Sequence, residues 1–250
     1  MRIAIAGYGV VGRAHAALFQ NFHEVVVIDP KHYDRTFDDT IDAVIVCVPT
    51  PKGLGGACDM VHITEVLKDC PDVPILIKST ISLQGWSYIN DKFDRKIAFS
   101  PEFLRAASAL EDLREQTVIM LGGEEVKFWT KIFKEVFPNC PHILEADPKD
   151  LITIKYFRNA FLATKVTFFN QLYDYCKASG LNFDNIRQHV TADPRIGPSH
   201  SYVSEARGFG GECLPKDVAA LYLSALYYGL DLNMIDSVIK YNNKIRNEDN

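Results

Sequence analysis

A glycine-rich turn near the N-terminus constrains the fold more than any other part of the sequence. Gly7-Tyr8-Gly9-Val10-Val11-Gly12 follows an apolar strand pattern at residues 3–6 and opens a helical pattern that runs to about residue 19. A second strand pattern covers residues 25–28. In this setting the first glycine permits a tight turn, the second lets the backbone approach a pyrophosphate, and the third lets the helix pack against the strand. The arrangement predicts a βαβ unit that binds a dinucleotide at the helix N-terminus.

Asp29 ends the second strand pattern, 22 positions after Gly7. A carboxylate at this place accepts hydrogen bonds from the hydroxyls of an adenosine ribose and repels a 2′-phosphate, so NAD is the expected cofactor. Lys31 and Arg35 follow closely, which leaves NADP disfavoured but open. The alternative for the glycine pattern is a plain tight turn, and the strand, helix and acid in register argue against it.

Strand and helix patterns alternate along the first half of the chain. Further strands are expected at residues 43–48, 75–78, 96–99, 117–121 and 142–144, with helices near 60–69, 83–92 and 125–136. From about residue 148 only helical patterns follow, at 149–179, 183–190, 215–228 and 232–247. The pattern predicts an α/β fold: a Rossmann-type doubly wound parallel sheet at residues 1–147, then an all-helical domain at 148–250.

Composition excludes several classes of protein. The net charge of −5 over 250 residues argues against a general nucleic-acid or anionic-membrane surface. No apolar run approaches the length needed to span a bilayer. The six cysteines form no CxxC pair, which argues against a zinc site and against a small disulfide scaffold. We therefore expect a cytoplasmic protein without metal.

Cys213 is the feature with the clearest chemical consequence. It lies in Gly208-Phe209-Gly210-Gly211-Glu212-Cys213-Leu214-Pro215-Lys216-Asp217, directly before a helical pattern. Pro215 suits a first helical turn, and the unpaired N–H groups of a helix N-terminus favour thiolate over thiol. We expect the neighbouring glycines to let a substrate approach the backbone closely. The alternative is a buried structural cysteine, because free cysteine is among the residue types most often buried.

Short runs along nearly the whole chain resemble the UDP-glucose/GDP-mannose dehydrogenase family. Besides the glycine turn and the Cys213 segment, the matching runs are Val48-Pro49-Thr50-Pro51 with Asp59, Lys78-Ser79-Thr80, Ser100-Pro101-Glu102-Phe103-Leu104-Arg105, Lys155 with Asn159, Phe169-Asn170, and Asp193-Pro194-Arg195-Ile196-Gly197. The resemblance implies a four-electron oxidation, in which the C6 alcohol of a nucleotide sugar becomes a carboxylate and two NAD molecules are reduced.

The resemblance also implies roles for six residues. Cys213 adds to the aldehyde to give a thiohemiacetal and then a thioester, which water hydrolyses. Lys155 and Asn159, four residues apart on one helix face, stabilise the developing oxyanion. Asp217 works with the lysine on the attacking water, Thr80 helps to hold that water, and Glu102 is an acid of the nicotinamide-side loop.

Two binding sets follow from the same resemblance. The expected cofactor contacts are Gly7, Tyr8, Gly9, Val10, Val11, Gly12, Asp29, Val48, Pro49, Thr50, Thr80 and Lys216. The expected substrate contacts are Glu102, Phe103, Leu104, Arg105, Lys155, Asn159, Arg195, Phe209 and Gly210. The family's arginine at the position of Arg195 can reach a partner subunit's site, which would make dimerisation part of the active site; a plain surface arginine is the alternative. The long helical pattern at 149–179 is the expected surface of a homodimer through the helical domain, with a buried core helix as the alternative.

Three departures from the family pattern bear on function. Ala106 stands where the family carries a second glutamate, so a carboxylate that orients water is expected to be missing. The segment between Asp29 and Asp42 is short, and the C-terminal domain that covers the nucleotide is expected to be absent. The expected substrate is UDP-glucose. A UDP-amino-sugar or GDP-mannose is the alternative within the same reaction class. A catalytically impaired NAD-binding relative with an assembly or regulatory role, and a two-electron hydroxyacid dehydrogenase, also stay open.

Overall fold

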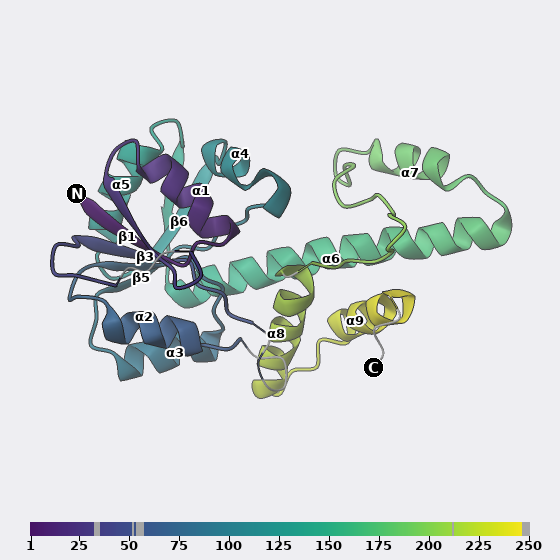
Figure 1. The fold of residues 1–250 in the computed structure, drawn as a ribbon. Helices are drawn as coiled ribbons and strands as arrows, with labels where there is room; N and C mark the ends of the chain where they lie inside the picture. The colour runs from purple at the N-terminus through teal and green to yellow at the C-terminus, as the bar shows by residue number, and fades with distance from the viewer. Residues whose placement is uncertain (33–35, 52, 54–57, 212, 247–250) are drawn as a thin grey trace. The chain divides into compact units, whose positions relative to one another are not determined.

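The computed structural model describes residues 1–32, 36–51, 53, 58–211 and 213–246. The chain forms two compact units, which divide between Lys155 and Tyr156. The division lies inside helix α6 (Pro148–Ser179), and the domain ranges 1–147 and 148–250 stay a prediction. Figure 1 shows the elements in chain order.

The first unit is built on one seven-stranded sheet in the order β2-β1-β3-β4-β5-β6-β7. The strands are β1 (Arg2–Ala6), β2 (Glu24–Ile28), β3 (Ala43–Val46), β4 (Ile75–Ile77), β5 (Ile97–Phe99), β6 (Val118–Gly123) and β7 (His142–Glu145). Every expected strand is present. All neighbouring pairs are parallel except β5 and β6. The expected α/β class with a Rossmann-type sheet is therefore confirmed, with one antiparallel pair.

Glycines allow the antiparallel approach of β6 to β5. Ala98 pairs with Gly123 and Phe99 with Gly122. Gly123 has φ +96°, and a Cβ built there would lie 2.6 Å from the carbonyl oxygen of Ile97. No side chain fits that gap, so the pairing at this point requires glycine.

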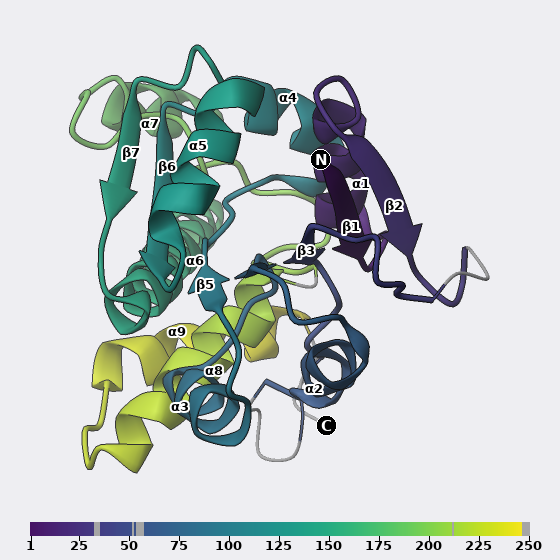
Figure 2. The same cartoon turned by 90° about the vertical axis from the view of Figure 1, so that its left-hand side faces the viewer.

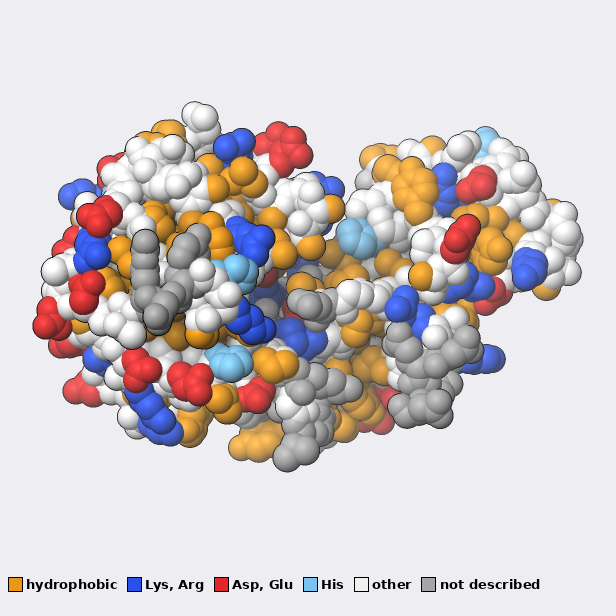
Figure 3. All heavy atoms as spheres, in the orientation of Figure 1, with side chains coloured by type: hydrophobic (Ala, Val, Ile, Leu, Met, Phe, Trp, Pro, Cys, Tyr) orange, Lys and Arg blue, Asp and Glu red, His pale blue; other side chains and the backbone are white. Residues whose placement is uncertain are grey.

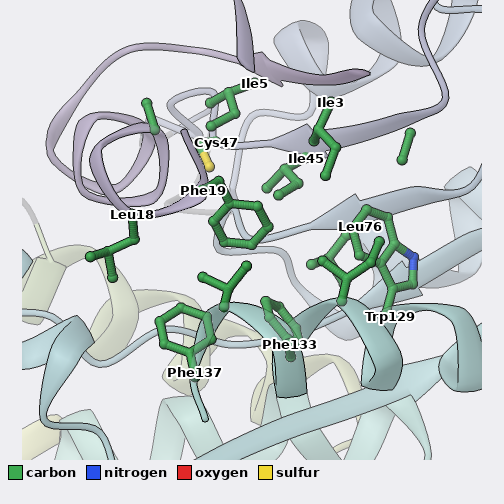
Figure 4. Packing of buried hydrophobic residues seen from close by; sticks show 14 of the residues in the cluster. Ile3, Ile5, Leu18, Phe19, Ile45, Cys47, Leu76, Trp129, Phe133 and Phe137 are labelled. Carbon is green, nitrogen blue, oxygen red and sulfur yellow. The ribbon is translucent and has the colours of Figure 1, made fainter. Parts of the chain in front are cut away.

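Helices cover both faces of the sheet (Figures 1 and 2), as a doubly wound fold requires. One face carries α1 (Val10–Phe19), α4 (Ala109–Arg114) and α5 (Val126–Val136), and the other carries α2 (Val61–Asp69) and α3 (Leu83–Lys92). Figure 4 shows Phe19 of α1 beside Phe133 of α5 and Phe137, the residue that follows α5. The ring of Phe19 lies 6.1 Å from each of these two rings in edge-on geometry. Burial of such side chains, at about 1.5–3 kcal/mol each, anchors α1 and its glycine turn to the sheet.

In the second unit the described residues form helices and connecting segments. The rest of α6 is followed by α7 (Phe183–Thr191), α8 (Cys213–Tyr227) and α9 (Asn233–Arg246), which confirms the four expected helices. The Asn182 side chain accepts a hydrogen bond from the Asn185 amide and so caps the start of α7. Cys213 is the first residue of α8, so the expectation that it lies at a helix N-terminus is confirmed.

The surface carries mixed charge. In Figure 3, basic and acidic side chains are interspersed over the visible surface of the first unit, in keeping with a net charge of only −5. Among the described residues, no helix combines the length and the apolar character that crossing a membrane requires.

Candidate active site

The glycine turn between β1 and α1 uses its three glycines differently. Gly7 has φ +92°, and a Cβ there would lie 2.7 Å from the carbonyl oxygen of Cys47. A Cβ on Gly12 would lie 2.0 Å from the carbonyl oxygen of Gly7. A Cβ on Gly9 would meet nothing within 4 Å. Gly7 and Gly12 are thus required by the protein's own packing, whereas the space beside Gly9 is open to a ligand.

Asp29 is tied to this turn. Its Oδ2 accepts a 2.7 Å hydrogen bond from the Tyr8 amide, and its Oδ1 lies 2.9 Å from the Lys31 amide and 3.1 Å from His32 Nδ1. Partial burial raises the pKa of Asp29, but the hydrogen bonds from Tyr8, His32 and Lys31 outweigh burial and lower it overall. The carboxylate is therefore ionised at neutral pH and suits a ribose hydroxyl as a hydrogen-bond acceptor.

The carboxyl ends of β3 and β4 bring further expected cofactor residues together. Thr50 Oγ1 donates to the carbonyl oxygen of Thr80 at 2.7 Å. Ser79 Oγ donates to the carbonyl oxygen of Val48 at 2.7 Å. These two cross-links fix the loops that follow the central strands, which is where ligands bind in open α/β sheets.

A buried ion pair lies where β5 ends. Lys155 Nζ, from α6, lies 2.8 Å from Glu102 Oε1 and 2.9 Å from the Glu102 carbonyl oxygen. The two side chains are only 4% and 11% exposed. Burial raises the pKa of Glu102, but the charge and hydrogen bond of Lys155, with a bond from the Leu104 amide, lower it overall. Glu102 is thus ionised at neutral pH, and the ion pair holds the Lys155 amine in a fixed, buried position beside it.

Lys78 is a second buried cation that the sequence interpretation left without a role. Its Nζ donates to Ser100 Oγ at 3.0 Å and to the Pro101 carbonyl oxygen at 3.4 Å. Burial lowers the pKa of Lys78 to about 8, although the charge of Glu102 opposes this. The signal that could have revealed Lys78 is a lysine at the end of the apolar run Ile75-Leu76-Ile77, where a buried strand leaves no route to solvent.

In the second unit, the partly buried Asn159 pairs with Asp217. Asn159 Nδ2 donates to Asp217 Oδ2 at 2.7 Å, and Asp217 is fully buried. Lys216 Nζ lies 3.0 Å from Asp217 Oδ1. Cys213 is exposed, and it lies one helical turn before Asp217 on α8. The thiol, the amide and the carboxylate are therefore held by two helices of one compact unit.

The glycines before Cys213 serve a purpose that the sequence did not reveal. A Cβ on Gly208 would lie 2.3 Å from Asn242 Oδ1, and a Cβ on Gly210 would lie 2.9 Å from the guanidinium carbon of Arg246. Both contacts come from α9, so at these two positions glycine admits side chains of the protein itself. Gly211, with φ +79° and nothing within 4 Å of a built Cβ, leaves the space that we expected for a substrate.

The remaining expected substrate residues differ in their surroundings. Arg105 forms an ion pair with Asp112, and this pair lowers the pKa of Asp112 to about 2. Arg195 is 87% exposed and forms an ion pair with Asp193. Leu104 packs against the hydrophobic core, whereas Phe103 is half-buried. Ala106 is exposed and begins the short helix η2 (Ala106–Ser108).

Comparison with known proteins matches both parts of the chain to domains of one enzyme family. The NAD-binding domain of the UDP-glucose/GDP-mannose dehydrogenase family matches residues 31–140, and the central domain of the same family matches residues 152–244. The chain belongs to this family. A UDP-glucose 6-dehydrogenase of Campylobacter jejuni is 30% identical over 97% of this chain and 72% of its own length.

Other relatives are covered less completely by the chain. A UDP-glucose 6-dehydrogenase of Rickettsia typhi is 34% identical over 82% of this chain, and the match covers 50% of that protein. The chain thus spans about half the length of several relatives that it matches. A UDP-glucose dehydrogenase structure from Pyrobaculum islandicum superposes with a TM-score of 0.81 at 23% identity, over 97% of this chain and 68% of that one. At this identity the superposition shows a shared fold.

Proposed function

We propose that the protein oxidises the C6 alcohol of a nucleotide sugar, UDP-glucose first, to a carboxylate through covalent intermediates on Cys213. The observation that carries the proposal is that Cys213 is exposed at the start of α8, while the buried Asp217, one turn further along α8, accepts a hydrogen bond from Asn159 of α6. A two-electron dehydrogenase has no need of such a thiol. UDP-glucose is chosen because the UDP-glucose 6-dehydrogenases of Rickettsia typhi and Campylobacter jejuni match most of this chain.

The first unit suits NAD as the cofactor. Gly9 leaves room for a pyrophosphate against the start of α1, and the ionised Asp29 offers acceptors to ribose hydroxyls. Val48, Thr50 and Thr80 line the following strand ends. When bound, NAD supplies the oxidising power by accepting a hydride in each of two successive oxidations.

Cys213 holds the sugar between the two oxidations. The helix N-terminus favours the thiolate, which attacks the aldehyde carbon and forms a C–S bond while the carbonyl oxygen takes up a proton. Loss of a hydride and of that proton from the thiohemiacetal gives a thioester. Attack by water then breaks the C–S bond, which releases the carboxylate and regenerates the thiol. Covalent capture keeps the aldehyde from leaving the enzyme.

Lys155 and Asn159 are suited to stabilise the negative oxygen that develops in these steps. Both lie on α6 four residues apart, and each is oriented by a carboxylate: Glu102 holds Lys155, and Asp217 holds Asn159. A donor fixed before the reaction costs little reorganisation when charge develops, so it is an effective catalyst. In this proposal Asp217 also positions the hydrolytic water, a role that matters more because Ala106 offers no carboxylate.

We further propose that the protein is a homodimer through α6. Four exposed aromatic side chains, Phe157, Phe161, Phe168 and Tyr175, are 50–69% accessible. At about 100° per residue they lie within about 40° of one another around the helix axis. An apolar stripe of this kind on a soluble helix marks an interface, and a second copy offers the same stripe. The six cysteines, none in a disulfide, suit a cytoplasmic location.

A substrate panel tests the proposed activity. The protein is incubated with NAD and, in separate reactions, with UDP-glucose, GDP-mannose and UDP-N-acetylmannosamine, and the products are identified by mass spectrometry. We expect the uronic acid from UDP-glucose. Binding of NAD without an acid from any sugar would contradict the proposal and favour an NAD-binding relative that has lost activity.

A further inference from the structure

Residues 207–209, a few positions before Cys213, are held by side chains of α9. Phe209 donates its amide to Asn242 Oδ1 at 2.7 Å, and Asn242 Nδ2 donates to the Phe209 carbonyl oxygen at 3.1 Å. Asn242 is only 2% exposed and Phe209 only 4%. One buried amide therefore satisfies both backbone polar groups of a single residue, four positions before the thiol.

Neighbouring residues add to this restraint from α6. Asn170 Oδ1 accepts from the Gly208 amide at 3.1 Å and from Arg207 Nε at 2.9 Å. Arg207 also donates to Asp174 at 2.7 Å, and Arg246 of α9 donates to the Arg207 carbonyl oxygen at 3.1 Å. Residues 207–209 are thus fixed by side chains of two helices.

The sequence supports a specific role for Asn242. Ile235, Val238 and Asn242 follow the helical spacing of one buried face of α9. An asparagine on such a face is costly unless its amide is fully used. Gly208 complements it, because any side chain there would collide with Asn242 Oδ1.

We propose that Asn242 is a positioning residue for the Cys213 thiol. Its side-chain amide fixes the Phe209 backbone four positions before Cys213, and this restrains the position of the thiol at the start of α8. The Asn159–Asp217 bond fixes α8 one turn later, so the thiol lies between two restraints. The consequence for catalysis rests on the proposed function, whereas the effect on the thiol itself does not.

Alkylation of Cys213 by iodoacetamide tests this role in the full chain, without NAD or sugar. Peptide mass spectrometry follows Cys213, with the partly exposed Cys140 as an internal reference. In Asn242→Leu the first turn of α8 loses its fixed start, so thiolate is stabilised less. We expect Cys213 to react about tenfold more slowly at neutral pH, because a tenfold smaller fraction of the thiol is then ionised. The pH profile of its alkylation should move to higher pH by about one unit. The Cys140 rate should not change.

Asn243→Leu is the matched control. Asn243 is the adjacent residue on α9, and its side chain makes no hydrogen bond within the described part of the chain, so wild-type alkylation of Cys213 is expected. Gly208→Ala places a methyl group against Asn242 Oδ1 and so disturbs the same contact. This variant replaces Asn242→Leu if that protein does not fold. A folded Asn242→Leu or Gly208→Ala protein with the wild-type rate and pH profile would overturn the proposal. Failure of the wild type to oxidise any sugar would refute the proposed function and leave this thiol measurement valid.

Discussion

At the scale of single residues, the buried charges of the first unit form one connected group. Glu102 lies in the field of both Lys155 and Lys78, and Lys78 in turn influences His15 and Cys47. Burial lowers the pKa of His15 to about 3 and raises the pKa of Cys47 to about 12, so both are neutral. Lys78 and Glu102 are charged at neutral pH, and Glu102 forms its ion pair with Lys155.

Breaking the Lys155–Glu102 pair should leave one buried charge without compensation. We expect Glu102→Gln and Lys155→Met each to reduce the free energy of unfolding by about 3 kcal/mol, and the double variant to lose less than the sum. The pKa of Glu102 is lowered, so its contribution is present above about pH 4.3 and is lost as the pH falls below it. Urea titrations at several pH values measure this. Strictly additive losses would show that the two side chains do not interact.

Lys78 should give the opposite pH dependence. Its folded pKa of about 8 lies below the ordinary 10.5, so the unfolded chain binds more protons between these values and stability rises with pH there. Lys78→Met removes this rise. The wild type should thus gain about 3 kcal/mol relative to the variant between pH 8 and pH 10.5. An unfolding free energy difference that stays constant over this range would contradict the buried, charged state of Lys78.

At the scale of elements, strand and helix positions followed from apolar periodicity, whereas other features did not. Short helices such as α4 and η2 were missed because residues 106–114 carry little periodic apolar pattern. The direction of β6 depends on how Gly122 and Gly123 approach β5, which no local pattern encodes. The contact of α9 with Gly208 and Gly210 joins segments more than thirty residues apart. Motifs located the candidate site residues, but not the partners that orient them.

Substitutions at two glycines of the turn should distinguish an effect on cofactor binding from an effect on protein stability. Gly9→Ala adds a methyl group that meets nothing in the protein, so we expect unchanged thermal stability and NAD affinity reduced about tenfold, since a pyrophosphate needs that space. Gly12→Ala forces a methyl group against the Gly7 carbonyl oxygen and should reduce both. Calorimetry with and without NAD measures the two effects. Unimpaired NAD binding by Gly9→Ala would place the pyrophosphate elsewhere.

At the scale of the whole molecule, the proposed homodimer depends on the four exposed aromatic side chains of α6. Phe161→Glu combined with Phe168→Glu puts charge into the proposed interface, and we expect a monomer by sedimentation at micromolar concentration, with the helical signal retained. Lys177→Glu changes charge on the last turn of the same helix, away from the stripe, and should leave the dimer intact. A wild type that sediments as a monomer would refute the dimer.

Covalent catalysis by Cys213 is the central claim for the molecule, and the number of NADH molecules formed per UDP-glucose consumed tests it most directly. Cys213→Ala serves as the matched variant, because it removes only the exposed sulfur at the start of α8. We predict two NADH per sugar for the wild type and no carboxylate from the variant. One NADH per sugar, or two from Cys213→Ala at the wild-type rate, would contradict the account.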